Sequence, residues 1–311
     1  MKTFVDIVVY LLIRIVFGWV RLVPVNLAHF FCEALAVLVF RLDKKHRRIG
    51  MINLGIAFPE KDWHWKQDVL RRSFKQLGNH VVEFSRLSGL TASQVGQRVE
   101  YEDGRGLENY HKAKQDGRPL LFLTAHISVW ELLPVAHALL GNTLSFVVRP
   151  LDNPFLQNWS TELRTSCGNQ VLSKNRSLRQ VLKVLEKGED VGFLIDQNVQ
   201  EKEGVYVPFF GHPSCTSSIL AALALKTSAS IVVGFIYPRE DVPGHYRMRF
   251  HSPIQLSSSG DYKKDLVQGT AKFNRYIEKM IREYPHCWLW GHRRFQTQPD
   301  GTNLYDVERK K

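Results

Sequence analysis

The sequence predicts an α/β fold, with a mostly parallel central sheet flanked by helices and an N-terminal helical membrane anchor. Two observations carry this prediction. Short apolar runs alternate with helical patterns from residue 119 to residue 237, and two long apolar segments occupy the first 40 residues. The 311 residues are 44% hydrophobic and 23% charged, which is the composition of a folded protein and excludes a largely disordered chain.

Two apolar segments, residues 4–20 and 24–40, favour a membrane anchor within residues 1–45. A helix that crosses a bilayer needs about 20 mostly apolar residues, and each segment is marginal because polar or charged side chains interrupt it. The basic run at residues 41–48 suits the cytoplasmic side of an anionic bilayer. We therefore expect one spanning helix or two in-plane helices. A pair of buried core helices is the alternative.

The rest of the chain divides into two expected parts. Residues 46–100 form a helical segment that packs on the core, because residues 62–87 have apolar side chains at helical spacing. Residues 101–311 form the α/β domain, which ends in an amphipathic helix at 262–284. The polar, Gly-containing stretch 101–118 is predicted to be a linker.

The alternation within the α/β domain predicts a largely parallel sheet with helices on its faces. Buried strands are expected at residues 119–125, 144–149, 191–195 and 231–237. Helices are expected between and after them, at residues 128–140, 154–167, 178–187 and 216–227.

Charge and cysteine usage restrict the possible partners. The formal net charge of +12 favours anionic partners, such as an acidic membrane surface or phosphorylated and acidic substrates. The basic residues are spread along the chain without a recognisable nucleic-acid module, so we expect no nucleic acid. The four cysteines are scattered without a C-x-x-C pair, and we expect neither a metal site nor a cofactor.

The most informative stretch is LLFLTAHISVWELLPVAHALLG, at residues 120–141. The predicted strand ends at Ala125, which places His126 just beyond its carboxyl end, where ligand sites of parallel sheets lie. Ser128 and Glu131 have the spacing of a capping box, so a helix is expected to begin there. His126 would then lie in the turn between strand and helix.

A His in this turn and a Glu in the first helical turn form a candidate acid–base pair. We expect Glu131 to accept a hydrogen bond from one ring nitrogen of His126 and to leave the other nitrogen free as a general base for a hydroxyl. Amides at the start of the helix would stabilise an oxyanion. The alternative is a capping-box glutamate beside an ordinary loop histidine, and H-x4-E spacing by itself is a weak signal.

Polar residues follow two further predicted strands. Arg149 ends one of them, and its guanidinium would reach the same edge of the sheet and clamp a phosphate, unless it forms a surface salt bridge. Asp196, Gln197 and Asn198 follow a third strand, and three polar residues there favour a role in the site over a simple turn.

For three other residues the local sequence pattern gives only a weak indication of a role in the site. Arg164 lies on a predicted helix, where its pattern is that of a solvated face. Thr216 begins a helix of small residues and is a candidate N-cap. Arg294 follows Trp288 and Trp290, and such a cluster binds phosphate, lies at a membrane surface or reflects packed tryptophans.

Short motifs extend along the chain in a recognisable order, from about residue 5 to residue 301. They are NLGIAFP at 53–59, H-x4-E at 126–131, RPLDNP at 149–154, RTSCG at 164–168, DQN at 196–198, VPFFG at 207–211 with Thr216, and YPHCWLWGHRRFQTQP at 284–299. In this order they resemble the bacterial lipid A late acyltransferases, the lauroyl and myristoyl transferases of the lysophospholipid acyltransferase superfamily.

The resemblance implies roles for several residues. His126 and Glu131 match the catalytic dyad, and Arg164 and Asn53 match positions that support the site or bind substrate. The F-P-E-G-T-R element of glycerol-phosphate acyltransferases is absent, and Glu in place of Asp at position 131 leaves the branch of the family open. The residues expected to contact substrate are Asn53, Arg149, Arg164, Asp196, Gln197, Asn198, Thr216 and Arg294.

The implied activity is transfer of a fatty acyl chain from acyl carrier protein, or from coenzyme A, to a hydroxyl of a phosphorylated glycolipid, a lipid A precursor. The enzyme would act at the bacterial inner membrane with its catalytic domain facing the cytoplasm, in lipopolysaccharide biosynthesis. An acidic carrier protein suits a partner of charge +12. The hydroxyl would attack the thioester directly, since G-x-S-x-G is absent and no Ser or Cys lies in a nucleophile motif.

Two alternatives remain open from the sequence. The same chemistry could serve another glycolipid or a lysophospholipid. A non-catalytic basic protein that binds membranes would explain the charge but not the ordered motifs. The length of the acyl chain depends on the depth of a pocket, which the sequence does not reveal.

Overall fold

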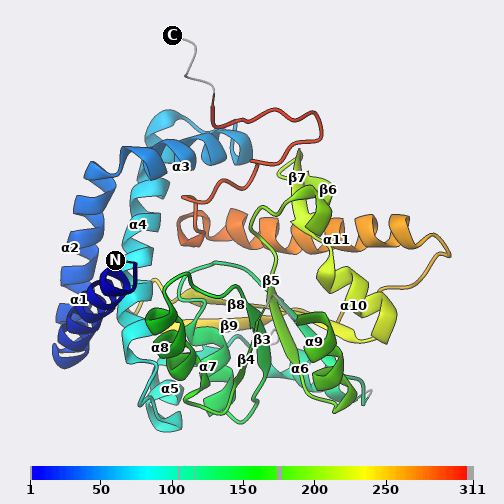
Figure 1. Ribbon diagram of the computed structural model, residues 1–311, viewed down its shortest axis with the longest axis horizontal. Helices are drawn as coiled ribbons and strands as arrows, with labels where there is room; N and C mark the ends of the chain where they lie inside the picture. The colour runs from blue at the N-terminus through cyan, green and yellow to red at the C-terminus, as the bar shows by residue number, and fades with distance from the viewer. Residues whose placement is uncertain (1, 104–105, 116, 174–176, 307–311) are drawn as a thin grey trace.

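The central element is a seven-stranded sheet of order β1-β9-β8-β2-β5-β3-β4. The computed structural model describes residues 2–103, 106–115, 117–173 and 177–306 (Figure 1). Neighbouring strands are parallel except for the antiparallel pair β8 and β9. The strands are β1 Val99–Tyr101, β2 Leu120–Thr124, β3 Ser145–Val148, β4 Gln170–Ser173, β5 Val191–Leu194, β8 Ser230–Pro238 and β9 Tyr246–Phe250, and a separate hairpin joins β6 Gly204–Phe209 to β7 His212–Ser217.

Helices cover both faces of the sheet, and a further group of helices lies beside it. Figure 1 shows α11 on one face, α6 and α7 on the other, and α1, α2 and α4 beside the sheet. The helices are α1 Lys2–Leu22, α2 Val25–Leu42, α3 Lys44–Ala57, α4 Trp63–Arg86, α5 Ala92–Arg98, α6 Leu107–Gln115, α7 Leu132–Leu139, α8 Pro154–Thr165, α9 Ser177–Glu186, α10 Ile219–Thr227 and α11 Tyr262–Glu283, with short 3₁₀ turns η2 Glu201–Glu203 and η3 Pro285–Cys287.

The central strand β2 divides the hydrophobic core into two layers. All five of its residues are buried, as expected for a strand with packed layers on both faces. Leu121 and Leu123 pack in the layer that contains residues of α3, α10 and α11. Leu120 and Phe122 pack in the opposite layer, with residues of α5, α6 and α7. This alternation holds β2 firmly, and with it the turn that follows.

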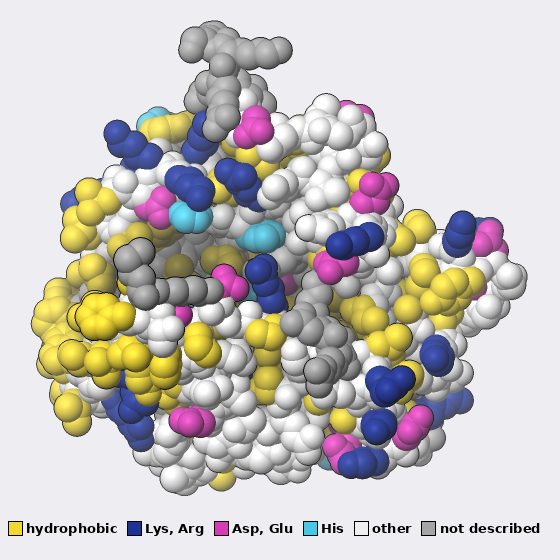
Figure 2. Space-filling model, viewed as in Figure 1, with side chains coloured by type: hydrophobic (Ala, Val, Ile, Leu, Met, Phe, Trp, Pro, Cys, Tyr) yellow, Lys and Arg dark blue, Asp and Glu magenta, His cyan; other side chains and the backbone are white. Residues whose placement is uncertain are grey.

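The two N-terminal helices are surface elements. Both are long and apolar enough to cross a membrane, but only 6% of the α1 window and 11% of the α2 window is buried. The alternative of two buried core helices is therefore wrong. Figure 2 shows apolar side chains gathered on the side of the molecule where Figure 1 places α1 and α2. Apolar patches of this extent on a folded domain mark a membrane or partner surface.

The α/β fold class is confirmed, and so are the four predicted strands, which are β2, β3, β5 and β8. The predicted helices at residues 62–87, 154–167, 178–187 and 262–284 are α4, α8, α9 and α11. The predicted linker at 101–118 is wrong, because it contains α6, whose Tyr110 and Ala113 are buried. Strands β1, β4, β6, β7 and β9 were not predicted, since they are short or carry polar residues.

Two helix starts also differ from the prediction. The helix expected from residue 128 begins only at Leu132. The helix expected from residue 216 begins at Ile219, because residues 212–217 pair with β6 as strand β7. Ser128 bonds to the distant Cys287, and residues 212–217 form a hairpin with β6; these contacts outweigh the local helical preference.

Candidate active site

The turn that follows β2 is held by the segment after α11. The carbonyl of His126 accepts from Leu289 N at 3.1 Å, and Ser128 N donates to Cys287 O at 2.7 Å. Ile127 forms an antiparallel bridge with Trp288. Ser128 has φ of 54°, an uncommon conformation for a non-glycine residue, which these contacts stabilise.

Asp196 is the hydrogen-bond partner of His126. Strands β2 and β5 are parallel neighbours, so the residues beyond their carboxyl ends meet at one edge of the sheet. Oδ1 of Asp196 lies 2.8 Å from Nδ1 of His126. Its other oxygen accepts from His126 N at 3.0 Å and from Trp288 Nε1 at 2.8 Å. The carboxylate therefore fixes both the ring and the backbone of His126.

The prediction that Glu131 accepts a hydrogen bond from His126 is wrong, because the Glu131 carboxylate binds a different side chain. Glu131 instead accepts from Arg164, at 2.8 Å from Nε and 2.5 Å from Nη2, in a bidentate ion pair. The expected capping box is also wrong. Glu131 itself is the N-cap residue of α7 and makes no side-chain capping bond, and the left-handed Ser128 cannot act as the N-cap of a helix that begins at Leu132.

The electrostatics of His126 follow from this geometry. Burial by itself would lower its pKa, but the charge and hydrogen bond of Asp196, with a contribution from Glu131, outweigh burial and raise the pKa above its usual value. Burial likewise opposes the charge of Asp196, yet His126 and the Trp288 hydrogen bond lower the Asp196 pKa to about 2. Asp196 is thus ionised at neutral pH.

The second ring nitrogen of His126, Nε2, lies beside Gln197. Nδ1 donates to the Asp196 carboxylate, which leaves Nε2 as the acceptor in the neutral ring. Nε2 accepts a hydrogen bond from the side-chain amide nitrogen of Gln197 at 3.3 Å. The His126 side chain is 20% exposed, so a hydroxyl group can approach this nitrogen. The arrangement is that of a general base with an orienting carboxylate.

The Glu131–Arg164 pair lies close enough to His126 to act on it electrostatically. Burial opposes the charge of Glu131, but the hydrogen bonds and charge of Arg164 outweigh it, and the Glu131 pKa is lowered. Glu131 in turn raises the pKa of His126. The two carboxylates thus both favour the imidazolium form, one by contact and one from a distance.

An aromatic stack borders the site and was not predicted. The ring of Trp130 lies 5.1 Å from that of His126, edge to face, and stacks on His80 of α4 at 3.6 Å. Burial lowers the pKa of His80 to about 4, so this ring is neutral. The sequence gives little warning of it, because a histidine in a long amphipathic helix resembles any polar-face residue.

Of the other residues predicted to bind substrate, three lie at the same edge of the sheet. Gln197 faces His126, and Asn198 N donates to His292 Nε2 at 2.9 Å. Arg149 is exposed just beyond the end of β3. Arg164, predicted as a solvated helix residue by its pattern alone, is instead 13% exposed and bound to Glu131.

Asn53, Thr216 and Arg294 are buried structural residues, which corrects their expected contact with substrate. Asn53 Nδ2 donates to the carbonyls of Trp290 and His292, each at 2.7 Å. Arg294 Nη2 donates to Thr216 Oγ1 at 2.6 Å. Thr216 lies in β7 and is not a helix cap. These residues fix the segment after α11, which in turn holds the turn of His126.

The helix α1 packs against α8, one of the helices beside the site. Asn153, the N-cap residue of α8, donates to the carbonyl of Asp6 at 2.8 Å, and Phe17 contacts Trp159 at 4.9 Å between ring centroids. Helix α8 also carries Arg164. The apolar N-terminal surface therefore adjoins the site. Within the described residues, no group of three His, Cys, Asp or Glu side chains is placed to hold a metal ion.

Comparison with known proteins decides the family. The family model described as bacterial lipid A biosynthesis acyltransferase matches residues 2–297. The chain belongs to this family. It is 27% identical over 290 residues to the lipid A biosynthesis palmitoleoyltransferase of Escherichia coli K12, which covers 92% of this chain and 90% of the relative. It is also similar to the lauroyltransferase of the same organism, at 26% identity over 271 residues, 86% of this chain and 84% of the relative.

A relative from Haemophilus influenzae, named lipid A biosynthesis acyltransferase, is 25% identical over 272 residues, which cover 86% of this chain and 83% of the relative. The family resemblance expected from the motifs is thus confirmed, and this acyltransferase is an enzyme and not a non-catalytic basic protein. Two apolar N-terminal helices are consistent with its association with a membrane.

Proposed function

We propose that the acyltransferase moves a fatty acyl group from the thioester of acyl carrier protein to a hydroxyl of a lipid A precursor. The names of its relatives support both the reaction and the acceptor. The single observation that carries the mechanism is the contact of His126 with Asp196, which keeps the hydrogen on Nδ1 and leaves Nε2 as the basic nitrogen; the acceptor hydroxyl would take the place of Gln197 beside it. The basic surface suits an acidic carrier protein and a phosphorylated acceptor.

The reaction begins when the acceptor hydroxyl lies against Nε2 of His126. The imidazole takes the hydroxyl proton as the oxygen attacks the thioester carbonyl. Asp196 stabilises the imidazolium that forms, because its carboxylate accepts the Nδ1 hydrogen. The C–S bond then breaks, and the imidazolium returns its proton to the departing thiolate. The step needs no covalent intermediate on the enzyme.

Glu131 supports this step without a direct bond to His126. Its negative charge favours the imidazolium, and its ion pair holds Arg164 at the wall of the site. Glu131 therefore remains part of the proposed catalytic machinery, with Asp196 in the orienting role that the sequence assigned to Glu131. Gln197, Asn198 and Arg149 are proposed to contact the substrates from the same edge of the sheet.

The N-terminal helices favour in-plane binding over a spanning anchor. Helix α2 is tied to α4 by Lys75 and Asn79, which bind Glu33, and α1 is tied to α8. A bilayer-spanning position would carry polar residues of α4 into the hydrocarbon region, where charged side chains are costly. We propose that both helices lie in the cytoplasmic face of the inner membrane, beside a site that opens toward the lipid.

The test uses the purified full chain with matched thioesters of acyl carrier protein and coenzyme A. Each donor is combined with a lipid A precursor, a different glycolipid or a lysophospholipid, and products are measured by mass spectrometry. We expect the fastest transfer with the carrier protein and the lipid A precursor. A preference for another acceptor, or an unchanged lipid A in a strain that lacks the gene, would reject the proposed acceptor.

A further inference from the structure

A basic pocket of about 270 Å³ lies between the start of α3 and the C-terminal segment. Four cationic side chains line it, from Lys44, Lys45, Arg48 and Arg293, together with two isoleucines and Tyr305. Figure 2 shows Lys and Arg side chains above the central hollow of this face, in the region where Figure 1 places α3. The catalytic mechanism uses none of these residues.

The charge of the pocket favours a phosphate group. Its lining includes no Asp or Glu among the described residues. The nearby carboxylate of Asp43 is bound to His46, at 3.0 Å from the backbone N and 2.6 Å from Nδ1. Arg binds phosphate through a planar fork of donors, and Lys binds it as a point charge. Because Lys and Arg side chains line the same pocket, several hydrogen-bond donors can contact one phosphate.

The walls of the pocket are held together in the folded protein. Tyr305 is buried, and its hydroxyl donates to Asn53 Oδ1 at 2.6 Å. Asn53 in α3 also binds the carbonyls of Trp290 and His292, so it connects α3 to the segment that carries Arg293. A site whose walls are fixed before binding costs less entropy when it takes a ligand.

The position of the pocket matches the level of lipid headgroups. Helix α2 ends with Leu38, Val39 and Leu42, which are 48%, 41% and 71% exposed. The first lysine of the pocket follows two residues after Leu42. Because phosphates lie at the boundary between acyl chains and water, an in-plane α2 would bring the pocket to that boundary.

The pocket is also linked to the reaction site. Arg293 follows His292, whose Nε2 accepts from Asn198 N at 2.9 Å. Gln197, the residue before Asn198, lies beside His126. A substrate with a phosphate at Arg293 could therefore extend along this short segment to the base.

We propose that this pocket binds a phosphate group of the acceptor lipid while the acceptor hydroxyl lies at His126. This inference rests on the proposed function and names a subsite for one of its substrates. The pocket recognises the phosphate through Lys44, Lys45 and Arg293. A phosphate on the acyl donor and the phosphates of bulk membrane lipids share the same chemistry, and the test separates these sources.

The experiment compares the full-length variants Lys44→Gln/Lys45→Gln and Arg293→Gln with the wild type. The control is Lys263→Gln/Lys264→Gln, which removes the same charge from the first turn of α11, at the opposite end of the molecule in Figure 1. The acceptor KM, donor KM and kcat are measured with a phosphorylated acceptor and with the same acceptor after phosphatase treatment. Binding to anionic vesicles without substrate is measured in parallel.

We expect each pocket variant to raise the KM for the phosphorylated acceptor by about tenfold, with kcat and donor KM within about threefold of the wild type. With the dephosphorylated acceptor, the pocket variants should match the wild type, and the control should match it throughout. An equal rise in KM for both acceptors, a rise in donor KM instead, or a change confined to vesicle binding would each overturn the proposal.

The wild-type measurement separates this inference from the proposed function. If the wild type transfers no acyl group to the phosphorylated acceptor, the proposed function itself fails. If the wild type is active and the pocket variants keep its acceptor KM, only the phosphate subsite is rejected. Because Lys44 and Lys45 are exposed, their replacement leaves the core intact, which thermal unfolding can verify.

Discussion

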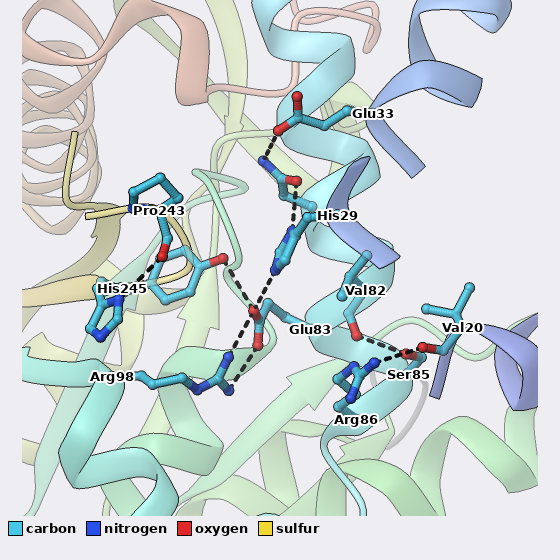
Figure 3. Close-up of polar contacts among 12 residues, drawn as sticks. Val20, His29, Glu33, Val82, Glu83, Ser85, Arg86, Arg98, Pro243 and His245 are labelled. Atoms are coloured by element: carbon cyan, nitrogen blue, oxygen red, sulfur yellow. Dashed lines mark hydrogen bonds and ion pairs between the residues drawn. The ribbon is translucent and has the colours of Figure 1, made fainter. Parts of the chain in front are cut away.

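Two buried carboxylates, Glu83 in α4 and Asp196 beyond β5, each face a histidine, and each is 1% exposed. Their other partners differ. Glu83 accepts from both terminal nitrogens of Arg98, at 3.2 and 3.1 Å (Figure 3). It also accepts from the hydroxyl of Tyr246 at 3.3 Å. Asp196 accepts from Trp288 and from the backbone and ring of His126. A guanidinium balances one charge, and an imidazole balances the other.

The two histidines, His29 and His126, also differ in the partners of their ring nitrogens. The two ring nitrogens of His29 lie 2.8 Å from the side-chain oxygen of Asn79 and 3.2 Å from a carboxylate oxygen of Glu83. Figure 3 shows the His29 ring pointing toward Glu83. In His126 only Nδ1 meets a carboxylate, and Nε2 lies toward Gln197 at 3.3 Å. A ring with both nitrogens on acceptors holds two helices together, whereas a ring with one basic nitrogen, bonded only to an amide that a hydroxyl can replace, can move a proton.

The largest effect is expected from His126→Ala. Loss of the general base should lower kcat/KM by about 10³- to 10⁴-fold, because proton transfer by a positioned side chain contributes about 10²–10⁴ and this base also binds the hydroxyl. Initial rates of acyl transfer, measured with the carrier-protein thioester, test this. Activity near that of the wild type would remove His126 from the mechanism.

Asp196→Asn should follow, with a loss of about 10²- to 10³-fold, since the amide disturbs the tautomer of His126. A neutral His126 is the active base, so activity rises as pH increases through its pKa. Asp196 raises that pKa, and its removal should move the acidic limb of the pH–rate profile to lower pH. An unshifted limb would contradict the assignment of Asp196 as the partner of His126.

Glu131→Gln distinguishes the two carboxylates near the base. Because Glu131 acts on His126 from a distance, we expect a loss of kcat/KM of about 10- to 50-fold. The free energy of unfolding of the variant should also fall by about 3 kcal/mol, because Arg164 would stay buried without its counter-ion. Rate measurements and chemical denaturation test both effects. A greater loss of activity for Glu131→Gln than for Asp196→Asn would reverse the roles assigned here.

Glu83→Gln should have the smallest effect on the reaction, with kcat within about threefold of the wild type, and should destabilise the fold by about 3 kcal/mol. Burial opposes the charge of Glu83, but His29 and Arg98 outweigh it and lower the Glu83 pKa. Its stabilisation is therefore complete above pH 4.5, the ordinary value, and is lost as pH falls through the lower folded pKa.

Denaturation of wild type and Glu83→Gln between about pH 2 and pH 7 tests this linkage. The stability difference should shrink toward the acid end of the range. A kcat that falls by orders of magnitude, with the fold intact, would show that the two carboxylates do not divide into structural and catalytic groups.

The sequence predicted the position of the site better than its contacts. Apolar runs located β2 and β5, and the rule for parallel sheets placed His126 and Asp196 at their carboxyl ends. Their pairing could not be predicted, because it depends on the order of strands in the sheet and joins residues 70 positions apart. The neighbouring Glu131 attracted attention only because it is close in sequence.

Local patterns therefore determined the α/β class, the two apolar N-terminal helices and the residue types available for acid–base chemistry, since each depends on spacing along the chain. Tertiary structure alone decided which carboxylate meets which cation, and it placed Asn53, Thr216 and Arg294 in the interior. The physical reason is that a buried charge needs a partner within hydrogen-bonding distance, and only the packed arrangement of distant segments determines which partner is there.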